Sequence, residues 1–251
     1  MELKEFFENH SKAALAFSGG ADSSYLLYAA TRCGADVTAY YVRSQFQPEF
    51  EYRDAVRLAG ELGAKMRVLN ADVLAADEVA SNPPNRCYFC KKQIMGLIKS
   101  AARQDGYDLI IDGTNASDDG GDRPGMRVLS ENGILSPLRI CGITKPEVRA
   151  LSKRAGLFTW DKPAYACLAT RIKSGEQITA QKLIRVERSE DLLFSMGFTD
   201  FRVRCSGDSA MLQFTAAQLP SAYEKQTEIV RELGKSFSTV HIDDNPREAS
   251  V

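Results

Sequence analysis

Two cysteines separated by two residues mark one place where this sequence could do chemistry. At the C-x-x-C spacing of Cys87 and Cys90, two thiols can bind one metal centre. The neighbouring positive charges of Arg86, Lys91 and Lys92 favour thiolates, which bind metals and attack electrophiles. Two buried loop cysteines are an alternative interpretation. A redox pair is another, although the motif does not follow the first strand of a thioredoxin-like unit.

A third cysteine that could react is Cys167, in a stretch (160–171) rich in aromatic, small and basic residues. The stretch falls near the predicted domain junction, and loops at such junctions often carry chemistry. Arg171 follows four residues later, where a guanidinium can lower the pKa of a thiol or hold a phosphate. A structural loop with Arg171 at the surface is the alternative. The remaining cysteines are expected to be core or near-core thiols: Cys33, Cys141 and Cys205.

The stretch S-G-G-A-D-S at 18–23 predicts a phosphate-binding loop. Its glycines let a ligand approach the backbone, and the helix start that follows offers unpaired N–H groups and a positive dipole end. Ser18 and Ser23 add hydroxyl donors. Asp22 would repel a bare phosphate, so its presence indicates Mg²⁺. An ordinary strand–turn–helix capped by Asp22 or Ser23 is the alternative, and neither the Walker nor the dinucleotide glycine pattern is present.

Predicted strands and helices alternate through the first half of the chain, and this alternation predicts a mostly parallel sheet. The predicted strands are 13–17, 37–42, 65–69, 108–111 and a short 134–138. The predicted helices are 22–33, 49–62, 91–104 and 145–155. The last third differs, with a helix (180–196), a hairpin (201–205 and 210–214), a helix (220–233) and a strand (237–242). We therefore expect an α/β domain over 1–158 and a smaller α+β domain over 159–251.

Composition narrows the function classes. The chain has 251 residues, with 32 Lys and Arg against 33 Asp and Glu, and such balanced charge disfavours a nucleic-acid partner. No apolar run approaches the roughly 20 residues of a membrane span, and no signal-peptide pattern opens the sequence. We expect a cytoplasmic protein with reduced thiols and no membrane partner. The two histidines disfavour a histidine-based triad.

The phosphate-loop motif resembles the PP-loop of the N-type ATP pyrophosphatases, which cleave ATP to AMP and pyrophosphate while adenylating a substrate. The resemblance implies an adenine site at the end of the second strand. The D-G-T-N turn at 112–115 suits a ligand-facing position at a strand's carboxyl end, with a plain turn as the alternative. Mg²⁺ is expected at Asp22, and the acidic loop with Asp118, Asp119 and Asp122 is either a second magnesium ligand set or simply solvated. The implied ATP contacts are Ala16, Ser18, Gly19, Gly20, Asp22, Ser23, Tyr41, Val42, Ser44, Gly113, Thr114 and Arg123.

Five motifs together resemble the LarE family, over most of the chain. They are the phosphate loop, R-C-Y-x-C-K (86–91), D-G-T-N (112–115), D-R-P-G (122–125) and K-P-x-x-A-C-L-x-[ST]-R (162–171). The resemblance implies an ATP-dependent sulfur transferase that adenylates a carboxylate of pyridinium-3,5-biscarboxylic acid mononucleotide. A thiocarboxylate for the nickel-pincer cofactor results, with release of AMP and pyrophosphate.

The resemblance also implies two sources for the sulfur. In one branch of the family, the cysteine matching Cys167 donates its own sulfur and becomes dehydroalanine. In another, a C-x-x-C joins that cysteine to hold a [4Fe-4S] cluster. Because Cys87 and Cys90 are present, the sequence resembles the cluster branch, with sulfide or a sulfur-donor system as a further partner. Ring-like homo-oligomers are implied as well.

Two arginines in the second domain suit the phosphate of this small nucleotide substrate. Arg202 and Arg204 alternate along a predicted strand, so both point to one face, where paired guanidiniums can bind a phosphate. The family resemblance assigns substrate binding to these two arginines, with Glu190 nearby and Arg171. An exposed strand face is the alternative.

Three rival functions remain open from the sequence. A tRNA thiolase is also an adenylating sulfur transferase, but the near-neutral charge and the lack of a nucleic-acid module count against it. An amidating PP-loop enzyme needs an ammonia source, and no glutaminase domain fits in this length. A non-enzymatic nucleotide- or metal-binding module is the third alternative.

Overall fold

The computed structural model describes residues 1–118 and 124–249, which form two compact units. The first unit comprises Met1–Asp72 and Asn85–Lys162, and the second comprises Val73–Pro84 and the chain from Pro163 onward. The sequence places the division after residue 158 and assigns 73–84 to the first domain, so the structure differs at both points. Backbone N–H groups of Gly175 and Ile178 donate to the carbonyls of Asn82 and Ala80, which ties the inserted segment to the second unit.

A four-stranded parallel sheet forms the centre of the first unit. Its strands are β1 (Lys12–Ala16), β2 (Asp36–Arg43), β3 (Lys65–Asn70) and β4 (Ile110–Asp112), in the order β3-β2-β1-β4. The alternating strand and helix pattern is thereby confirmed as an α/β fold. A fifth strand at 134–138 was expected and is wrong: Leu135 forms a single bridge to Ile111. Pro137 lacks the N–H that a ladder needs, and it opens a helical turn instead.

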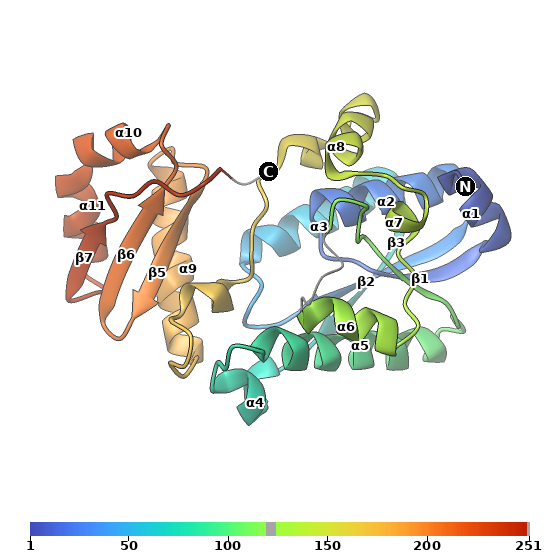
Figure 1. Ribbon diagram of the computed structural model, residues 1–251, viewed down its shortest axis with the longest axis horizontal. Coiled ribbons are helices and arrows are strands. Elements are labelled where there is room, and N and C mark those ends of the chain that lie inside the picture. Colours follow the sequence, from blue (N-terminus) through green and yellow to red (C-terminus); the bar gives the residue numbers. More distant parts are fainter. Residues whose placement is uncertain (119–123, 250–251) are drawn as a thin grey trace. The chain divides into compact units, whose positions relative to one another are not determined.

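Helices cover both faces of this sheet (Figure 1). They are α1 (Leu3–Asn9), α2 (Ala21–Arg32), α3 (Glu49–Leu62), α5 (Arg86–Gln104), α6 (Pro124–Glu131), α7 (Pro137–Ile140), α8 (Lys145–Arg154) and the 3-10 turn η2 (Phe158–Asp161). Side chains alternate across the pleat, so Leu15 packs in the core with α2 and α3, while Ala14 packs with α5 and α6. The carboxyl ends of the strands are thus held rigidly at one edge.

The second unit is a three-stranded sheet with helices. Its elements are η1 (Val73–Ala75), α4 (Asp77–Ala80), η3 (Leu168–Arg171), α9 (Ala180–Ser195), β5 (Phe201–Ser206), β6 (Ser209–Phe214), α10 (Leu219–Glu224), α11 (Gln226–Leu233) and β7 (Thr239–Ile242). The strand order is β5-β6-β7, antiparallel between β5 and β6 and parallel between β6 and β7. The expected single helix over 220–233 is interrupted at Lys225, whose ψ of 7° ends α10. This α+β arrangement confirms the predicted class.

Within the described part of the chain, none of the helices combines the length and apolarity that crossing a membrane requires.

Candidate functional site

The phosphate loop connects the end of β1 to the start of α2. Gly19 has a φ of +75°, a conformation that side chains disfavour. A Cβ at this position would also stand 3.1 Å from the Ala55 Cβ and 3.3 Å from the Glu51 carbonyl oxygen. Glycine is therefore required twice over, because the loop adopts a left-handed conformation and packs closely against the first turns of α3.

Two serines brace the loop from within. The hydroxyls of Ser18 and Ser23 lie 3.0 Å apart, and the Ser23 hydroxyl donates to the Gly20 carbonyl over 3.2 Å. Gly20 is the N-cap of α2, and no side chain caps it. The alternative reading, in which Asp22 or Ser23 merely caps the helix, is therefore wrong. The binding of phosphate by the N–H groups of the first turn of α2 stays a prediction.

Asp22 is held by two side chains, one from the predicted D-G-T-N turn and one, Lys145, that no sequence motif placed in the site. Its carboxylate accepts from Lys145 Nζ over 2.6 Å and from Asn115 Nδ2 over 3.3 Å. Lys145 begins α8, directly after Thr144, which forms a capping box with Glu147. The capping box can be recognised in the sequence. The contact of Lys145 with Asp22 cannot, because the two residues are 123 positions apart. A magnesium ion could bind Asp22 by exchanging one of these partners.

The turn after β4 packs directly onto the phosphate loop. A Cβ on Gly113 would stand 2.7 Å from the Ser23 backbone nitrogen, so only glycine permits this approach. Asp112 is 7% exposed, and its carboxylate accepts hydrogen bonds of 2.6 Å from the hydroxyls of Thr114 and Ser136. The D-G-T-N motif therefore builds one wall beside the loop.

The acidic loop that follows is only partly described. Asp118 accepts from the Asn115 backbone N–H over 3.0 Å, which orders the end of the turn. Asp119, Asp122 and Arg123 lie outside the described residues, so the predicted contact of Arg123 with ATP stays a prediction.

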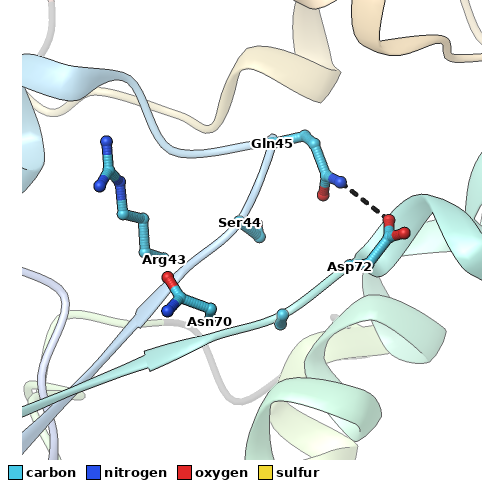
Figure 2. A pocket seen from close by; sticks show the side chains of 6 residues that line it. Arg43, Ser44, Gln45, Asn70 and Asp72 are labelled. Carbon is cyan, nitrogen blue, oxygen red and sulfur yellow. Dashed lines mark hydrogen bonds between the residues drawn. The ribbon is translucent and has the colours of Figure 1, made fainter.

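The ends of β2 and β3 border a hollow of about 480 Å³ (Figure 2). It is lined by Arg43, Ser44, Gln45, Asn70, Ala71 and Asp72. The Gln45 amide donates to Asp72 over 2.8 Å across the two strand ends. Of the three residues predicted here, Ser44 lines the hollow. Tyr41 and Val42 are buried in the two cores of the sheet. Their side chains do not line the hollow, and the predicted contacts of both residues with ATP stay predictions.

Cys87 and Cys90 lie in the first turn of α5, whereas the sequence predicted them just before a helix starting at Lys91. Cys87 is exposed and Cys90 is half-buried. The Arg86 guanidinium donates to the Cys87 sulfur over 3.4 Å. Burial lowers the pKa of Lys91, and the charges of Asp112 and Asp118 oppose that shift. The start of α5 is thus electrostatically linked to the turn after β4.

The predicted cluster ligands are divided between the two units: Cys87 and Cys90 belong to the first and Cys167 to the second. Among residues 1–118 and 124–249, no three His, Cys, Asp or Glu side chains gather in the way a metal ion needs. Two thiols one turn apart fit part of a cluster site, and the cluster itself stays a prediction.

Arg171 and Glu190 form a buried ion pair in the second unit. The Arg171 Nε lies 2.7 Å from Glu190 Oε1, and each residue is 1% exposed. The alternative of a surface Arg171 is therefore wrong. Tyr165 donates to the other oxygen of Glu190, and its ring lies 4.6 Å from the Arg171 guanidinium. Arg171 also donates to the Ala166 carbonyl over 3.1 Å, next to Cys167.

Arg202 and Arg204 hold the backbone around Cys167. Arg202 donates to the Ala164 carbonyl over 2.8 Å, and Arg204 donates to the Thr170 carbonyl over 2.5 Å. Arg202 is 7% exposed, so it does not sit on an exposed strand face. Burial, followed by repulsion from Arg171, lowers the pKa of Arg202 to about 10. Cationic groups here outnumber carboxylates, and this surplus favours an anion.

A parallel sheet with an S-G-G-x-D-S loop at the end of its first strand defines the PP-loop class of ATP pyrophosphatases. A tRNA-specific 2-thiouridylase of Fervidobacterium nodosum is 26% identical over 41% of this chain and 36% of its own. No protein-family model matches the chain.

Two further relatives match most of the chain. An uncharacterized Synechocystis protein is 36% identical over 86% of this chain and 81% of its own. The pyridinium-3,5-bisthiocarboxylic acid mononucleotide synthase of Lactiplantibacillus plantarum is 33% identical over 83% of this chain and 76% of its own. The chain belongs to the LarE family of sulfur transferases and is an enzyme.

Proposed function

We propose that this enzyme converts a carboxylate of pyridinium-3,5-biscarboxylic acid mononucleotide into a thiocarboxylate, at the expense of ATP, for nickel-pincer cofactor synthesis. The observation that carries the proposal is the 33% identity, over 83% of the chain, to a synthase named for the bisthiocarboxylic product. The braced phosphate loop beside the Gly113 turn supports the ATP-dependent part of the reaction.

Adenylation comes first, on the first unit. A carboxylate oxygen of the substrate attacks the α-phosphorus of ATP, and the bond to pyrophosphate breaks. The N–H groups at the start of α2 hold the pyrophosphate, while Asp22 binds Mg²⁺ and Lys145 supplies a positive charge beside it. The adenosine lies against the strand ends, near Ser44 and Gly113. The result is an acyl-adenylate, in which AMP is a good leaving group.

Sulfur transfer follows. A thiolate attacks the acyl carbon and AMP departs, because a neutral thiol is a poor nucleophile. If Cys167 is the nucleophile, a thioester forms; loss of the Cα proton then breaks the Cβ–S bond, leaving a thiocarboxylate and dehydroalanine. If sulfide attacks instead, the thiocarboxylate forms directly. Cys87, Cys90 and Cys167 would hold a [4Fe-4S] cluster, which when bound can supply a coordination position for an added sulfide.

The arginines of the second unit bind the substrate phosphate in this proposal. Arg202 and Arg204 lie beside the segment that carries Cys167, and the buried pair of Arg171 with Glu190 fixes that segment. A homo-oligomeric assembly, a cytoplasmic location and a sulfide supply are further parts of the proposal.

Release of AMP and pyrophosphate, measured with and without the dicarboxylic nucleotide, tests the function. Substrate-dependent release together with a thiocarboxylate product is expected. Release that instead requires tRNA would favour the thiolase, and release that requires ammonia would favour the amidating enzyme. If neither the dicarboxylic nucleotide nor tRNA nor ammonia stimulates release, a binding module is favoured and the proposal is contradicted.

A second pair of measurements separates the sulfur sources. Anaerobic reconstitution should load about four irons if the three cysteines serve as ligands. No iron uptake would contradict the cluster. Mass spectrometry of the protein after turnover should show loss of H₂S at Cys167 only if that residue gives up its own sulfur.

A further inference from the structure

Lys162 is the last residue of the first unit, and its side chain is clamped between two carboxylates. Its Nζ lies 2.9 Å from Glu51 Oε2 and 2.7 Å from Asp54 Oδ2. The side chains of Lys162 and Glu51 are 13% and 11% exposed, so their contact is largely shielded from water, whereas the Asp54 side chain is 31% exposed. Burial raises the pKa of Glu51, and the Lys162 charge opposes that shift. The attraction between opposite charges is stronger in such surroundings than at a surface, although removing both charges from water offsets part of it.

The backbone at Lys162 is fixed as well. The Arg149 guanidinium donates to the carbonyls of Trp160 and Lys162 over 2.8 and 3.0 Å. Lys162 has φ −56° and ψ 122°, close to the polyproline II region and outside the α region that a following proline disfavours. The chain therefore leaves the first unit at a defined point.

The same turn of α3 that clamps Lys162 also supports the phosphate loop. Glu51 and Asp54 hold the lysine, while the Glu51 carbonyl and Ala55 stand 3.3 and 3.1 Å from the position of a Cβ on Gly19. The point where the chain leaves the first unit is therefore held in a fixed position relative to the phosphate loop, where the acyl-adenylate would form.

From Ala164 onward, the chain is held by the second unit. Arg202 bonds the Ala164 carbonyl, and Arg171 bonds the Ala166 carbonyl. The Cys167 carbonyl accepts from the Thr170 N–H over 3.0 Å. The hydrogen bonds within the first unit hold the chain up to Lys162, and those within the second unit hold it from Ala164, so only Pro163 lies between them. Five residues span at most about 18 Å, so a fixed Lys162 limits how far from it the Cα of Cys167 can lie.

We propose that Lys162 is a positioning residue for sulfur transfer: clamped by Glu51 and Asp54, it fixes the point from which the segment bearing Cys167 departs. The inference rests on the proposed function, because it assumes that Cys167 delivers sulfur to the acyl-adenylate. Lys162 does not contact ATP or the reacting carbonyl in this account. Its loss therefore affects the second half-reaction and leaves the first intact.

The test measures the two half-reactions separately. Lys162→Met keeps the aliphatic stem and removes the charge, and we expect substrate-dependent pyrophosphate release in a single turnover to stay within about twofold of the wild type. Thiocarboxylate formation should fall about tenfold or more, because the nucleophile loses its orientation. Lys162→Arg, which retains the charge, should recover most of that loss. Lys65→Met is the matched control. The Lys65 ammonium pairs with Asp36, but the Lys65 side chain is 69% exposed, and neither half-reaction should change in this variant.

Equal losses in both half-reactions, no loss of product, or no recovery with arginine would overturn the positioning role. Should Lys162→Met fail to fold, Asp54→Asn weakens the same clamp while Glu51 still holds the lysine, and the same split is expected. Measurements on the wild type distinguish a failure of the proposed function from a failure of the positioning role alone. If it releases no pyrophosphate with substrate, the proposed function fails and the positioning role with it. If it is active while Lys162→Met forms product normally, the positioning role alone fails.

Discussion

Replacing Gly113 by alanine tests the packing on which the ATP site depends. The new Cβ would stand 2.7 Å from the Ser23 nitrogen, whereas ordinary contacts begin at 3.4 Å, so the two backbones must separate by about 0.7 Å. Both contacting segments are backbone, one at the end of β4 and one in the first turn of α2. No flexible side chain can absorb the change. Forcing such a contact typically costs about 1–3 kcal/mol.

The effect on ATP follows from the same displacement. A shift of this size at a binding loop can cost tenfold or more in affinity or rate, so we expect the Kd for ATP to rise about tenfold. At an ATP concentration of about 100 times the wild-type Kd, ligand stabilises the native state by about 2.7 kcal/mol. The variant would gain only about 1.4 kcal/mol at the same concentration. Urea unfolding with and without ATP·Mg²⁺ measures both quantities.

Gly60→Ala provides the matched control, because Gly60 lies inside α3 and nothing stands within 4 Å of its Cβ position. This variant should be as stable as the wild type or more stable by about 0.5–1 kcal/mol, with an unchanged response to ATP. If Gly113→Ala behaves like Gly60→Ala in both measurements, the close approach of the β4 turn to the phosphate loop is refuted.

Three further variants address other parts of the site and fold. Asp22→Asn should reduce Mg²⁺-dependent pyrophosphate release about 100-fold while circular dichroism stays native, and near-normal release would exclude Asp22 as a magnesium ligand. Glu190→Gln leaves Arg171 buried without its counter-charge and should cost about 3–5 kcal/mol in urea unfolding; a loss below about 1 kcal/mol would contradict a buried pair. Hydrogen bonds, first from the Tyr40 hydroxyl, lower the pKa of Asp105 from 3.8. Its stabilising effect is therefore complete above that pH and is lost as pH falls below it, and Asp105→Asn should flatten the acid side of a Tm–pH curve.

The sheet of the first unit was predictable because its strands are short apolar runs between turn residues. β1 and β2 differ from the predicted ranges by one residue at each end. The start of α5 was not predictable in this way. Cysteine and the aromatic residues at 87–90 are weak helix formers, and two prolines precede them, yet helix begins at Arg86. Both cysteines therefore occupy one helical turn.

The polar contacts of the site were the least predictable part. Arg171 was expected to lower the pKa of the Cys167 thiol, to bind phosphate or to lie at the surface, and the structure pairs it with Glu190 in the interior. Nothing local to either residue signals that pairing. The Lys145 contact with Asp22 is likewise a product of the fold, since it joins the start of α8 to the start of α2. Sequence motifs identified residues whose side chains could bind ligands or react, whereas tertiary packing decides which partners those side chains contact.

A single turnover with ATP and the dicarboxylic nucleotide, followed by mass analysis of the small molecules, tests the central claim most directly. The account predicts one AMP formed for each substrate oxygen replaced by sulfur, and no such product when ATP is omitted. Formation of AMP from the same substrate without any sulfur-containing product, or a thiocarboxylate formed without ATP, would contradict it.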